Sequence, residues 1–453
     1  MNRLAFRFDQ NRCTGCHACQ LACTIENELP LTESWRHVVT FNPRRWPVLP
    51  VFHLSLACNH CAHAPCMGAC PALAFTRDPA TGAVLIDGSS CIGCRYCSWA
   101  CPYDAPRFDR RRGVTTKCTF CIERLHAGLA PACEAACPTG ALTATSLEES
   151  DLTVRSVGLP DGRALRPAVR IVPWDAARGR VGLAGDRPRL DALPARITVQ
   201  SEWPLAAFTL AVPTLVALMT AQVVDALALA VWPFLGLALL ATVLSASHLG
   251  RKLGVWRAVL GVRTSWLSRE VAGFAAFVAL GAVSLIVPTP PLVLDAATLA
   301  AGVATLVAID RVYRVHGIAV TSPGWSWHSA SALLTGILLA GVFARSAPVA
   351  AAVGGVKVLL YAGRKVSRYR QDRPVRPVVS AMRLGLGFVL PGTLWLSGEA
   401  ALYWLAVVSV LAGEAVDRGE FYDELEVATP ARQMELDLLA APRDRSSMGE
   451  GAA

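Results

Sequence analysis

The sequence predicts two fold classes in one chain: an α+β region built from repeated cysteine motifs, followed by an all-α polytopic membrane bundle of about eight transmembrane helices. Two observations predict this division. All 16 cysteines lie between Cys13 and Cys137. From about residue 200 onward the chain has no cysteine, and long apolar stretches follow one another. The expected regions are a cysteine-rich domain (1–149), an irregular extension and linker (150–200), a membrane part (201–425) and a polar C-terminal tail (426–453).

The most specific motif is CIGCRYCSWACP, residues 91–102. Its cysteines follow the spacing C-x2-C-x2-C-x3-C-P, which holds a cubane iron–sulfur cluster in bacterial ferredoxins. Cys91, Cys94 and Cys97 lie on one tight loop and can bind three irons of a single cube. Cys101 follows a short helical step and binds a neighbouring cluster instead, so the motif requires partner motifs.

Those partner motifs are present, because the cysteines form four groups of four. The first group repeats the spacing above, the second has a wider middle gap, and in the fourth an insertion separates two pairs before Pro138. Sixteen ligands make four [4Fe–4S] clusters with no cysteine left over, which predicts ferredoxin-like dicluster repeats. The groups are Cys13, Cys16, Cys19 and Cys23; Cys58, Cys61, Cys66 and Cys70; Cys91, Cys94, Cys97 and Cys101; and Cys118, Cys121, Cys133 and Cys137.

Two other roles of cysteine fit the pattern less well. Disulfides suit a secreted chain, but the opening MNRLAFRFDQ leads into the first motif without a signal peptide. Zinc sites rarely use three cysteines within seven positions together with a remote fourth.

The positive net charge is poor evidence for a nucleic-acid partner. Each oxidised cluster with its four thiolates carries about −2, so four clusters would bring the formal +9 of the chain to about +1. We therefore expect no nucleic-acid binding. Arg95 and Lys117, within and beside the motifs, either tune cluster potentials or are ordinary surface charges.

Long apolar stretches in the second half predict helices that cross a bilayer, because most are near the required length of about 17–25 residues. Asp225 is the one charged residue from Leu205 to Ser247, a stretch that suits two crossings joined by a tight turn. A large soluble helical bundle is the alternative, but buried helices seldom stay this apolar for so long. The predicted spans are 205–224, 226–247, 271–288, 292–309, 329–344, 347–362, 379–396 and 399–416.

Loop charges predict the orientation, because cytoplasmic loops carry an excess of lysine and arginine. With an even number of spans both termini lie on one side. The loops of the other side contain a single basic residue, Arg345. We therefore expect a multi-pass protein of the bacterial inner (cytoplasmic) membrane, with the iron–sulfur domain on the cytoplasmic face. The cations on that side are Arg251, Lys252, Arg257, Arg263, Arg269, Arg311, Arg314, Arg364, Lys365, Arg368, Arg370, Arg373 and Arg376.

The histidines of the membrane half, His248, His316 and His328, lie at or near span ends on the side of the cluster domain. None lies mid-membrane opposite another, as bis-histidine haem would require, so no haem is expected. A membrane part without haem must exchange electrons close to the clusters.

A quinone is the natural small redox molecule inside a bilayer. Its reduced form releases protons together with electrons, so its site needs titratable acceptors. His248 at the end of the second span and Glu270 at the start of the third could accept them. The alternative is structural: His248 caps its helix, and Glu270 pairs with Arg263 or Arg269.

These motifs resemble a known family. The first half is similar to the four-cluster iron–sulfur subunit of the dimethyl sulfoxide reductase family, and the second half is similar to that family's eight-span quinol-oxidising anchor. The chain thus resembles a natural fusion of two subunits over roughly residues 1–425. The matching residues are RCTGCHACQLAC (12–23), CNHCAHAPCMGACP (58–71), CIGCRYCSWACPYDAP (91–106), KCTFCIERL (117–125), SEWPLAAFT (201–209), SHLGRK (247–252), LSRE (267–270) and RGEFY (418–422).

The resemblance implies roles for particular residues. His248 occupies the histidine of the anchor's quinol-site motif, and Glu270 matches an acidic position of the same region. Some relatives replace one cysteine of the third motif and hold a three-iron cluster, but Cys94 is present here, so we expect four full cubes. The implied ligand sets are Cys13, Cys16, Cys19 and Cys137; Cys23, Cys118, Cys121 and Cys133; Cys58, Cys61, Cys66 and Cys101; and Cys70, Cys91, Cys94 and Cys97.

The resemblance also implies a function: an electron-transfer and membrane-anchor subunit of an oxidoreductase complex. It would oxidise menaquinol or ubiquinol and pass electrons to a separate molybdopterin (Mo-bisPGD) catalytic subunit, because no such domain fits within 453 residues. The cytoplasmic orientation departs from the family's exported cluster subunit, so nitrate or another oxo-compound becomes a candidate acceptor. Two alternatives stay open: a reverse-running quinone reductase fed by a dehydrogenase, and a membrane-tethered redox sensor without turnover.

Overall fold

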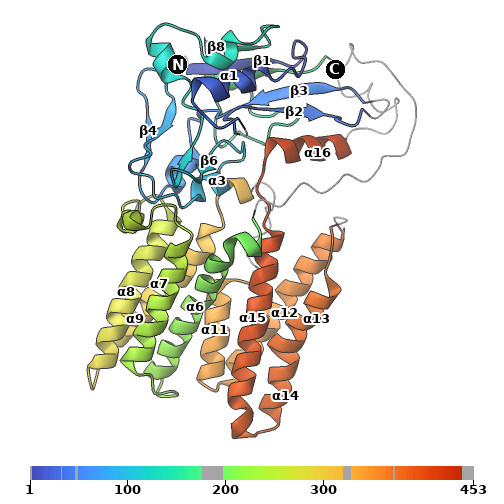
Figure 1. The fold of residues 1–453 in the computed structure, drawn as a ribbon. Coiled ribbons are helices and arrows are strands. Elements are labelled where there is room, and N and C mark those ends of the chain that lie inside the picture. Colours follow the sequence, from blue (N-terminus) through green and yellow to red (C-terminus); the bar gives the residue numbers. More distant parts are fainter. Residues whose placement is uncertain are drawn as a thin grey trace. The chain divides into compact units, whose positions relative to one another are not determined.

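The computed structural model describes residues 3–31, 33–45, 49–175, 197–319, 328–370 and 373–440. The chain forms two compact units (Figure 1). The first, here called the cysteine unit, comprises Met1–Pro194, His316–Thr321 and Val427–Ala453. The second, here called the membrane unit, comprises Ala195–Val315 and Ser322–Glu426.

A three-stranded sheet joins the two ends of the cysteine-rich segment. Its central strand β1 (Arg3–Asp9) pairs antiparallel with β8 (Leu142–Leu147) and parallel with β9 (Val169–Val172). Successive side chains of a strand point to opposite faces, and Phe6 and Phe8 of β1 point into the core. This pairing brings the last cysteine group beside the first.

Short elements make up the rest of the cysteine unit. Helices of this length are marginal in isolation, so their stability comes from packing and from what the motifs bind. The ribbons are β2 (His37–Phe41) with β3 (Phe52–Leu56), β4 (Phe75–Arg77) with β5 (Val84–Ile86), and β6 (Arg107–Asp109) with β7 (Val114–Thr116). The helices are α1 (Ala18–Glu26), α2 (Pro65–Ala69), α3 (Tyr96–Ala100), α4 (Ile122–His126), α5 (Ala132–Ala135), the 3-10 turn η1 (Glu149–Asp151) and α10 (His316–Ala319).

The first and third motifs share one backbone conformation. Gly15 and Gly93 both have φ of 70°, a left-handed value that favours glycine. The residues that precede α1 and α3, His17 at φ 61° and Arg95 at φ 60°, are left-handed as well. Each motif therefore turns sharply around its first cysteines and then enters a short helix that carries the later ones. The predicted ferredoxin-like α+β repeats are confirmed.

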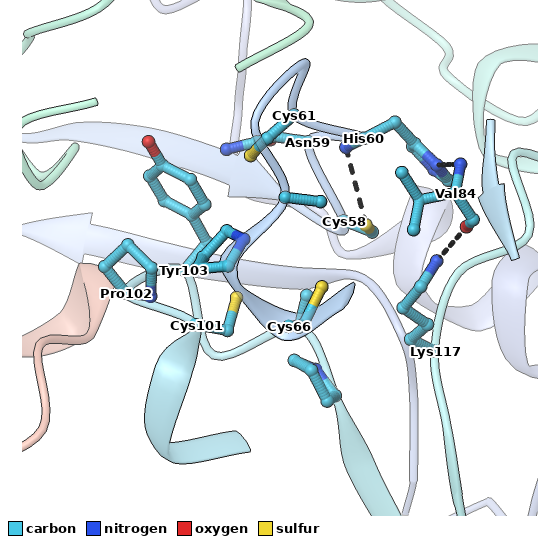
Figure 2. Close-up of a pocket in the computed structure, with 14 residues that line it drawn as sticks. Cys58, Asn59, His60, Cys61, Cys66, Val84, Cys101, Pro102, Tyr103 and Lys117 are labelled. Atoms are coloured by element: carbon cyan, nitrogen blue, oxygen red, sulfur yellow. Dashed lines mark hydrogen bonds between the residues drawn. The ribbon is translucent and has the colours of Figure 1, made fainter. Parts of the chain in front are cut away.

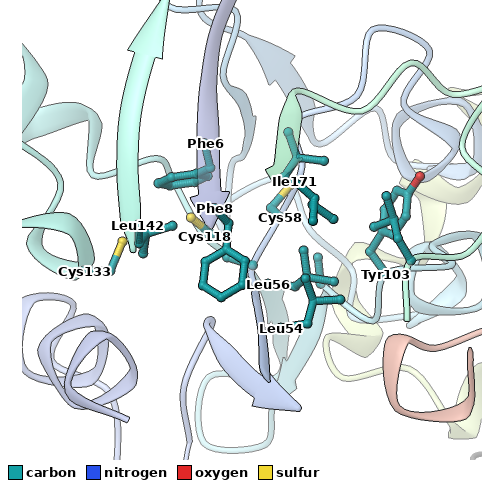
Figure 3. Close-up of a cluster of buried hydrophobic side chains, with 14 of the residues drawn as sticks. Phe6, Phe8, Leu54, Leu56, Cys58, Tyr103, Cys118, Cys133, Leu142 and Ile171 are labelled. Carbon is teal, nitrogen blue, oxygen red and sulfur yellow. The ribbon is translucent and has the colours of Figure 1, made fainter. Parts of the chain in front are cut away.

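Cysteines form part of the core of this unit. Cys58, Cys118 and Cys133 are buried in one cluster with Phe6, Phe8, Leu54 and other apolar side chains (Figure 3). The segment 426–453, expected to be a polar tail, contributes to the same core. Its helix α16 (Pro430–Ala440) buries Met434 and Leu438 there.

The membrane unit is helical. Its long helices run alternately up and down, so the ends at which α6 begins and α15 stops form one end of the bundle (Figure 1); the Val199 backbone N–H donates to Asp423 across 2.9 Å at that end. The elements are α6 (Val199–Val223), α7 (Val231–Ser247), η3 (Lys252–Val259), α8 (Trp266–Ile286), α9 (Leu292–Val312), α11 (Ala332–Phe343), α12 (Ala347–Arg370), α13 (Pro377–Leu384), the π-helical turn η4 (Gly385–Val389), α14 (Leu390–Leu396), η5 (Ala400–Leu402) and α15 (Tyr403–Glu424).

Each predicted span overlaps one of these helical segments. By length and apolarity, 5 helices of the described residues could each cross a membrane, or 6 if α7 and η3, bent by 105°, form one span. The helix α11 has 12 residues, and α12 carries basic residues in its last turns. A helical, membrane-capable second half is thus confirmed, while eight crossings stay a prediction.

Small residues allow these helices to approach closely, as is common in membranes. A side chain added at Gly302 of α9 would meet Val216 and Phe277, and one at Gly336 of α11 would meet Leu306. The backbones of Gly387 in η4 and Gly413 in α15 approach too closely for any side chain.

Four of the cations that were predicted to lie in the loop after the sixth span belong to the helix α12: Arg364, Lys365, Arg368 and Arg370. Arg364 and Lys365 lie in α12 and form ion pairs with acidic residues of α15. They are buried or nearly so, and part of the loop charge that predicted the orientation is therefore neutralised inside the bundle.

Candidate cluster-binding and membrane sites

Two of the four implied ligand sets line cavities of the cysteine unit. One cavity is lined by Cys13, Cys16, Cys19 and Cys137. Another is lined by Cys58, Cys61, Cys66 and Cys101, whose side chains surround a common space (Figure 2). In both cavities one cysteine comes from a different motif, which is the exchange of ligands that the C-P ending of the third motif predicts.

The remaining cysteines form two further neighbourhoods. Burial and the proximity of Cys133 raise the pKa of the Cys23 thiol and of the Cys121 thiol. Burial and the proximity of Cys70 and Cys91 raise the pKa of the Cys94 thiol to about 12. The other two ligand sets stay a prediction.

The four neighbourhoods form a series. The order begins with the set of Cys13 and continues with the sets of Cys23, Cys58 and Cys70. At each step, a thiol of one set lies within electrostatic range of a thiol of the next set. The pairs that join them are Cys19 with Cys133, Cys118 with Cys58, and Cys66 with Cys97.

The local geometry fits sulfur ligands of a cluster. Backbone N–H groups of His60, Gly93 and Phe120 each donate to the cysteine two positions earlier, across 3.4 Å. Such bonds stabilise a thiolate and tune a cluster. In the described part of the chain, no three His, Cys, Asp or Glu side chains are gathered around one point as a single metal ion requires. A cube needs no such gathering, because each cysteine binds a different iron.

A buried cation lies between the first two ligand sets. Arg36 is 1% exposed, lies within electrostatic range of Cys19, Cys23, Cys118 and Cys133, and donates to the Ser55 carbonyl across 3.3 Å. Its Nε and Nη2 have no hydrogen-bond partner among the described residues. Buried donors are normally satisfied, so these atoms fit an anionic group that the clusters would supply. The role of Arg36 was not predicted from the sequence, because no motif surrounds this residue.

The third ligand set also has nitrogen atoms of buried side chains around it. Lys117 lines this cavity and donates to the carbonyls of Val84 and Cys118 (Figure 2). His60 accepts the Val84 N–H at Nδ1 across 3.0 Å, while its buried Nε2 has no partner in the described chain. Lys117 is 1% exposed, so its interpretation as a surface charge is wrong. Arg95 is partly exposed and lies over Phe108.

Glu270, a predicted site residue, is buried in the membrane unit. It is 5% exposed on α8, and no ion pair joins it to another described residue. The alternative partner Arg269 donates instead to the Val262 and Arg263 carbonyls, at 2.9 and 2.7 Å.

Three groups lie around Glu270 that sequence reasoning did not assign. Tyr313 and Tyr422 are hydrogen-bonded to each other through their hydroxyls, and both lie within electrostatic range of Glu270 and of Arg418. Arg418 and Tyr422 belong to the RGEFY motif, which could have identified them. A carboxylate, two phenols and a guanidinium, all buried, can donate to and accept from a polar headgroup.

The predicted histidines lie in different places. His248 is half-buried at the C-terminal cap position of α7. Its role as a proton acceptor stays a prediction. His328 is buried in the membrane unit and stacks on Phe421 at 4.4 Å between ring centroids. His316 belongs to the cysteine unit.

Comparisons with known proteins agree with this division. Residues 49–147 match the family of 4Fe-4S dicluster domains, and residues 201–353 match the DMSO reductase anchor subunit. One component of the anaerobic dimethyl sulfoxide reductase of Haemophilus influenzae is 37% identical over 158 residues, which are 33% of this chain and 77% of that protein. One component of the tetrathionate reductase of Salmonella typhimurium is 41% identical over 143 residues, 31% of this chain and 56% of that protein. One component of the sulfite dehydrogenase of Allochromatium vinosum is 33% identical over 226 residues, 45% of this chain and 92% of that protein.

Proposed function

This protein belongs to the dimethyl sulfoxide reductase family, as an iron–sulfur electron-transfer subunit continuous with the family's multi-pass membrane anchor, and we propose that it oxidises a membrane quinol. Electrons would pass through four [4Fe–4S] clusters to a separate molybdopterin catalytic subunit. The observation that carries this proposal is the series of four cysteine neighbourhoods, in which each set lies beside the next. A series of this kind supports conduction along the cysteine unit.

The proposed ligand sets are those implied by the family resemblance. Burial raises the pKa of the Cys66 and Cys118 thiols, so iron must displace protons when the clusters assemble. The bound clusters would supply one-electron redox chemistry. The protein's own contribution is to donate N–H groups to the sulfurs and to place Arg36 and Lys117 against the negative charge.

The proposed quinol site contains His248 and Glu270, with Tyr313, Tyr422 and Arg418 around Glu270. A carboxylate buried in a membrane bundle is costly and usually marks a functional site. It would accept a quinol proton while the phenols and Arg418 orient the headgroup. Menaquinol and ubiquinol both fit this chemistry, and the cytoplasmic position of the cysteine unit remains part of the proposal.

The purified chain tests the proposal through quinol-driven cluster reduction, followed by EPR and visible absorption. Glu270→Gln and His248→Ala should each slow reduction by a quinol by about a hundredfold or more and leave reduction by dithionite unchanged. Glu399→Gln, an exposed carboxylate of the opposite bundle end, is the matched control. Clusters that form normally but that no quinol reduces, even in the unmodified chain, would support the redox-sensor alternative.

The similarity to a component of a sulfite dehydrogenase favours a second candidate, in which a dehydrogenase feeds electrons through the clusters to quinone. Redox-titrated EPR distinguishes the two directions. Potentials well below that of the quinone pool in all clusters would indicate quinone reduction, and at least one higher potential would support quinol oxidation. The terminal acceptor, nitrate or another oxo-compound, depends on the catalytic subunit.

A further inference from the structure

One face of α15 is acidic although the helix lies within the bundle. Glu414, Asp417, Glu420 and Glu424 follow one another at intervals of three or four residues, so they share a face. Each is less than 9% exposed. Ionisable residues inside a membrane bundle are costly and usually mark a path for ions or protons.

Cations of α12 and α13 bind this face along its length. At its inner end Glu414 pairs with Lys357 across 3.0 Å and with Arg383 across 2.7 Å. Asp417 pairs with Arg364 across 2.8 Å. Lys365 then joins Glu420 to Glu424, 2.7 Å from each.

Hydroxyl groups donate to the same carboxylates. Thr335 donates to Glu414 across 2.7 Å and accepts from Lys357 across 3.0 Å. Ser329 donates to Asp417 across 2.8 Å, and Tyr361 to Glu420 across 2.6 Å. Guanidinium groups complete the connection: Arg383 lies 2.7 Å from Glu414 and 3.3 Å from Asp417, and Arg364 lies 2.8 Å from Asp417 and 3.2 Å from Glu424. Ion pairs and hydrogen bonds thus form one series from the middle of α15 to its C-terminal end.

The inner end of this series meets a groove. The groove has a volume of about 410 Å³. It is lined by apolar residues of α11, α12, η4, α14 and α15. Apolar walls do not hold water by themselves, so water can enter this groove only where polar groups lie next to it. Gly354 and Gly387 line the groove one turn from Lys357 and Arg383.

Arg383 offers free donors at this junction. A side chain on Gly387 would collide with its guanidinium, so the arginine lies directly behind the groove wall. Its Nε and Nη1 have no hydrogen-bond partner within the described ranges, although the side chain is fully buried. Water at the end of the groove would satisfy them.

Two residues of the proposed quinol site lie on the same helix. Arg418 and Tyr422 alternate along α15 with the acidic residues. His328, stacked on Phe421, lies within electrostatic range of both Arg418 and Asp417. His328 and Arg418 therefore lie near both the proposed quinol site and the acidic face.

We propose that the acidic face of α15 conducts protons from the quinol site to the groove, so that they leave at the end of the bundle opposite to the start of α6. This inference rests on the proposed quinol oxidation. Each quinol O–H bond that breaks gives an electron to the clusters and a proton to Glu270. The proton then moves between carboxylates, hydroxyls and water until Glu414 passes it to water in the groove. Every group gains and loses one proton, so the series returns to its starting state.

Proteoliposomes that contain the full chain test this direction. A short-chain menaquinol is the donor, and ferricyanide outside, which cannot cross the bilayer, is the one-electron acceptor. Ferricyanide also oxidises menaquinol directly, so the rate in protein-free liposomes is subtracted, and the remaining rate comes from molecules with the cysteine unit outward. A trapped dye reports the pH of the lumen, while valinomycin and potassium remove the membrane potential. We expect about one proton in the lumen per electron transferred.

Two variants examine the route. Glu414→Gln should lower the lumenal proton yield per electron at least about fivefold. Thr335→Val, which removes only the bridging hydroxyl at equal size, should lower it by a smaller factor. Glu399→Gln is the matched control and should retain the full yield, and an unchanged rate of electron transfer from quinol confirms that the membrane unit of each variant is assembled.

The outcomes separate the two proposals. If quinol delivers no electrons to ferricyanide, the proposed function fails and takes this inference with it. If electrons arrive but the protons appear outside, or if both variants keep the full lumenal yield, this inference alone is overturned. The ionic series then serves only to hold the helices together.

Discussion

In the cysteine unit, Arg36 and His60 have buried nitrogen atoms without a hydrogen-bond partner among the described residues, whereas in the membrane unit the equally buried Lys357 is paired with Glu414 at 3.0 Å. Both units bury charge, but they differ in where the opposite charge comes from. The membrane unit supplies its own carboxylates. The cysteine unit offers thiols, whose burial raises their pKa, and cations whose donors point to a group that the polypeptide lacks. The comparison teaches that the clusters would balance the buried charge of the cysteine unit, whereas carboxylates of the membrane unit balance its own buried cations.

Removal of iron should produce the largest difference between the two units. A chelator with a mild oxidant should abolish the protease resistance of the cysteine unit, because its short helices and thiol-lined core depend on bound clusters. The helices of the membrane unit should keep their circular-dichroism signal and their resistance. A cysteine unit that stays resistant after complete loss of iron would show that its core is stable alone.

Loss of one carboxylate should be the next largest effect. Glu414→Ala leaves Lys357 and Arg383 buried without their shared partner, and breaking such a pair costs about 3–5 kcal/mol. Denaturation of the membrane unit in detergent measures the loss. Arg376→Ala breaks the more exposed pair with Asp423 in the same unit, in which Arg376 is 63% exposed, and should cost less than about 1 kcal/mol. Equal effects of both variants would contradict the difference between buried and exposed pairs.

Removal of the buried cation of the cysteine unit should have the smallest effect. Arg36→Gln removes a positive charge beside the first two ligand sets, so the reduced, more negative clusters lose stabilisation. Their potentials should fall by about 50–100 mV, measured by redox-titrated EPR. Arg111→Gln, at an exposed turn, is the control. A shift of similar size in the control, or none in Arg36→Gln, would show that Arg36 does not act on the clusters.

Local patterns made much of the fold predictable. The cysteine spacing of residues 91–101 determines a tight loop and a short helix, and the structure has both. Apolar length in the second half indicated helices, and each predicted span overlaps one. The grouping of Cys101 with Cys58, Cys61 and Cys66 followed from the family resemblance, and the structure gathers the same four around one cavity.

Other features could not be predicted because they depend on contacts between distant residues. Arg364 was counted as a loop cation, yet it pairs with Asp417 across the bundle. Met434 lies in a segment that is polar overall, and it is buried in the core of the cysteine unit. Tyr313 carries no motif, and its partner Tyr422 lies 109 positions away in the chain.

The amino-acid sequence by itself determined the ligands and the helices, because spacing within a few residues decides which thiols share a loop and apolar length decides which segments avoid water. Only the tertiary structure decided which charges are buried and what faces them. Charge burial depends on pairs such as Arg36 with the cysteine sets and Glu414 with Lys357, whose members lie far apart in the chain and meet only when it folds.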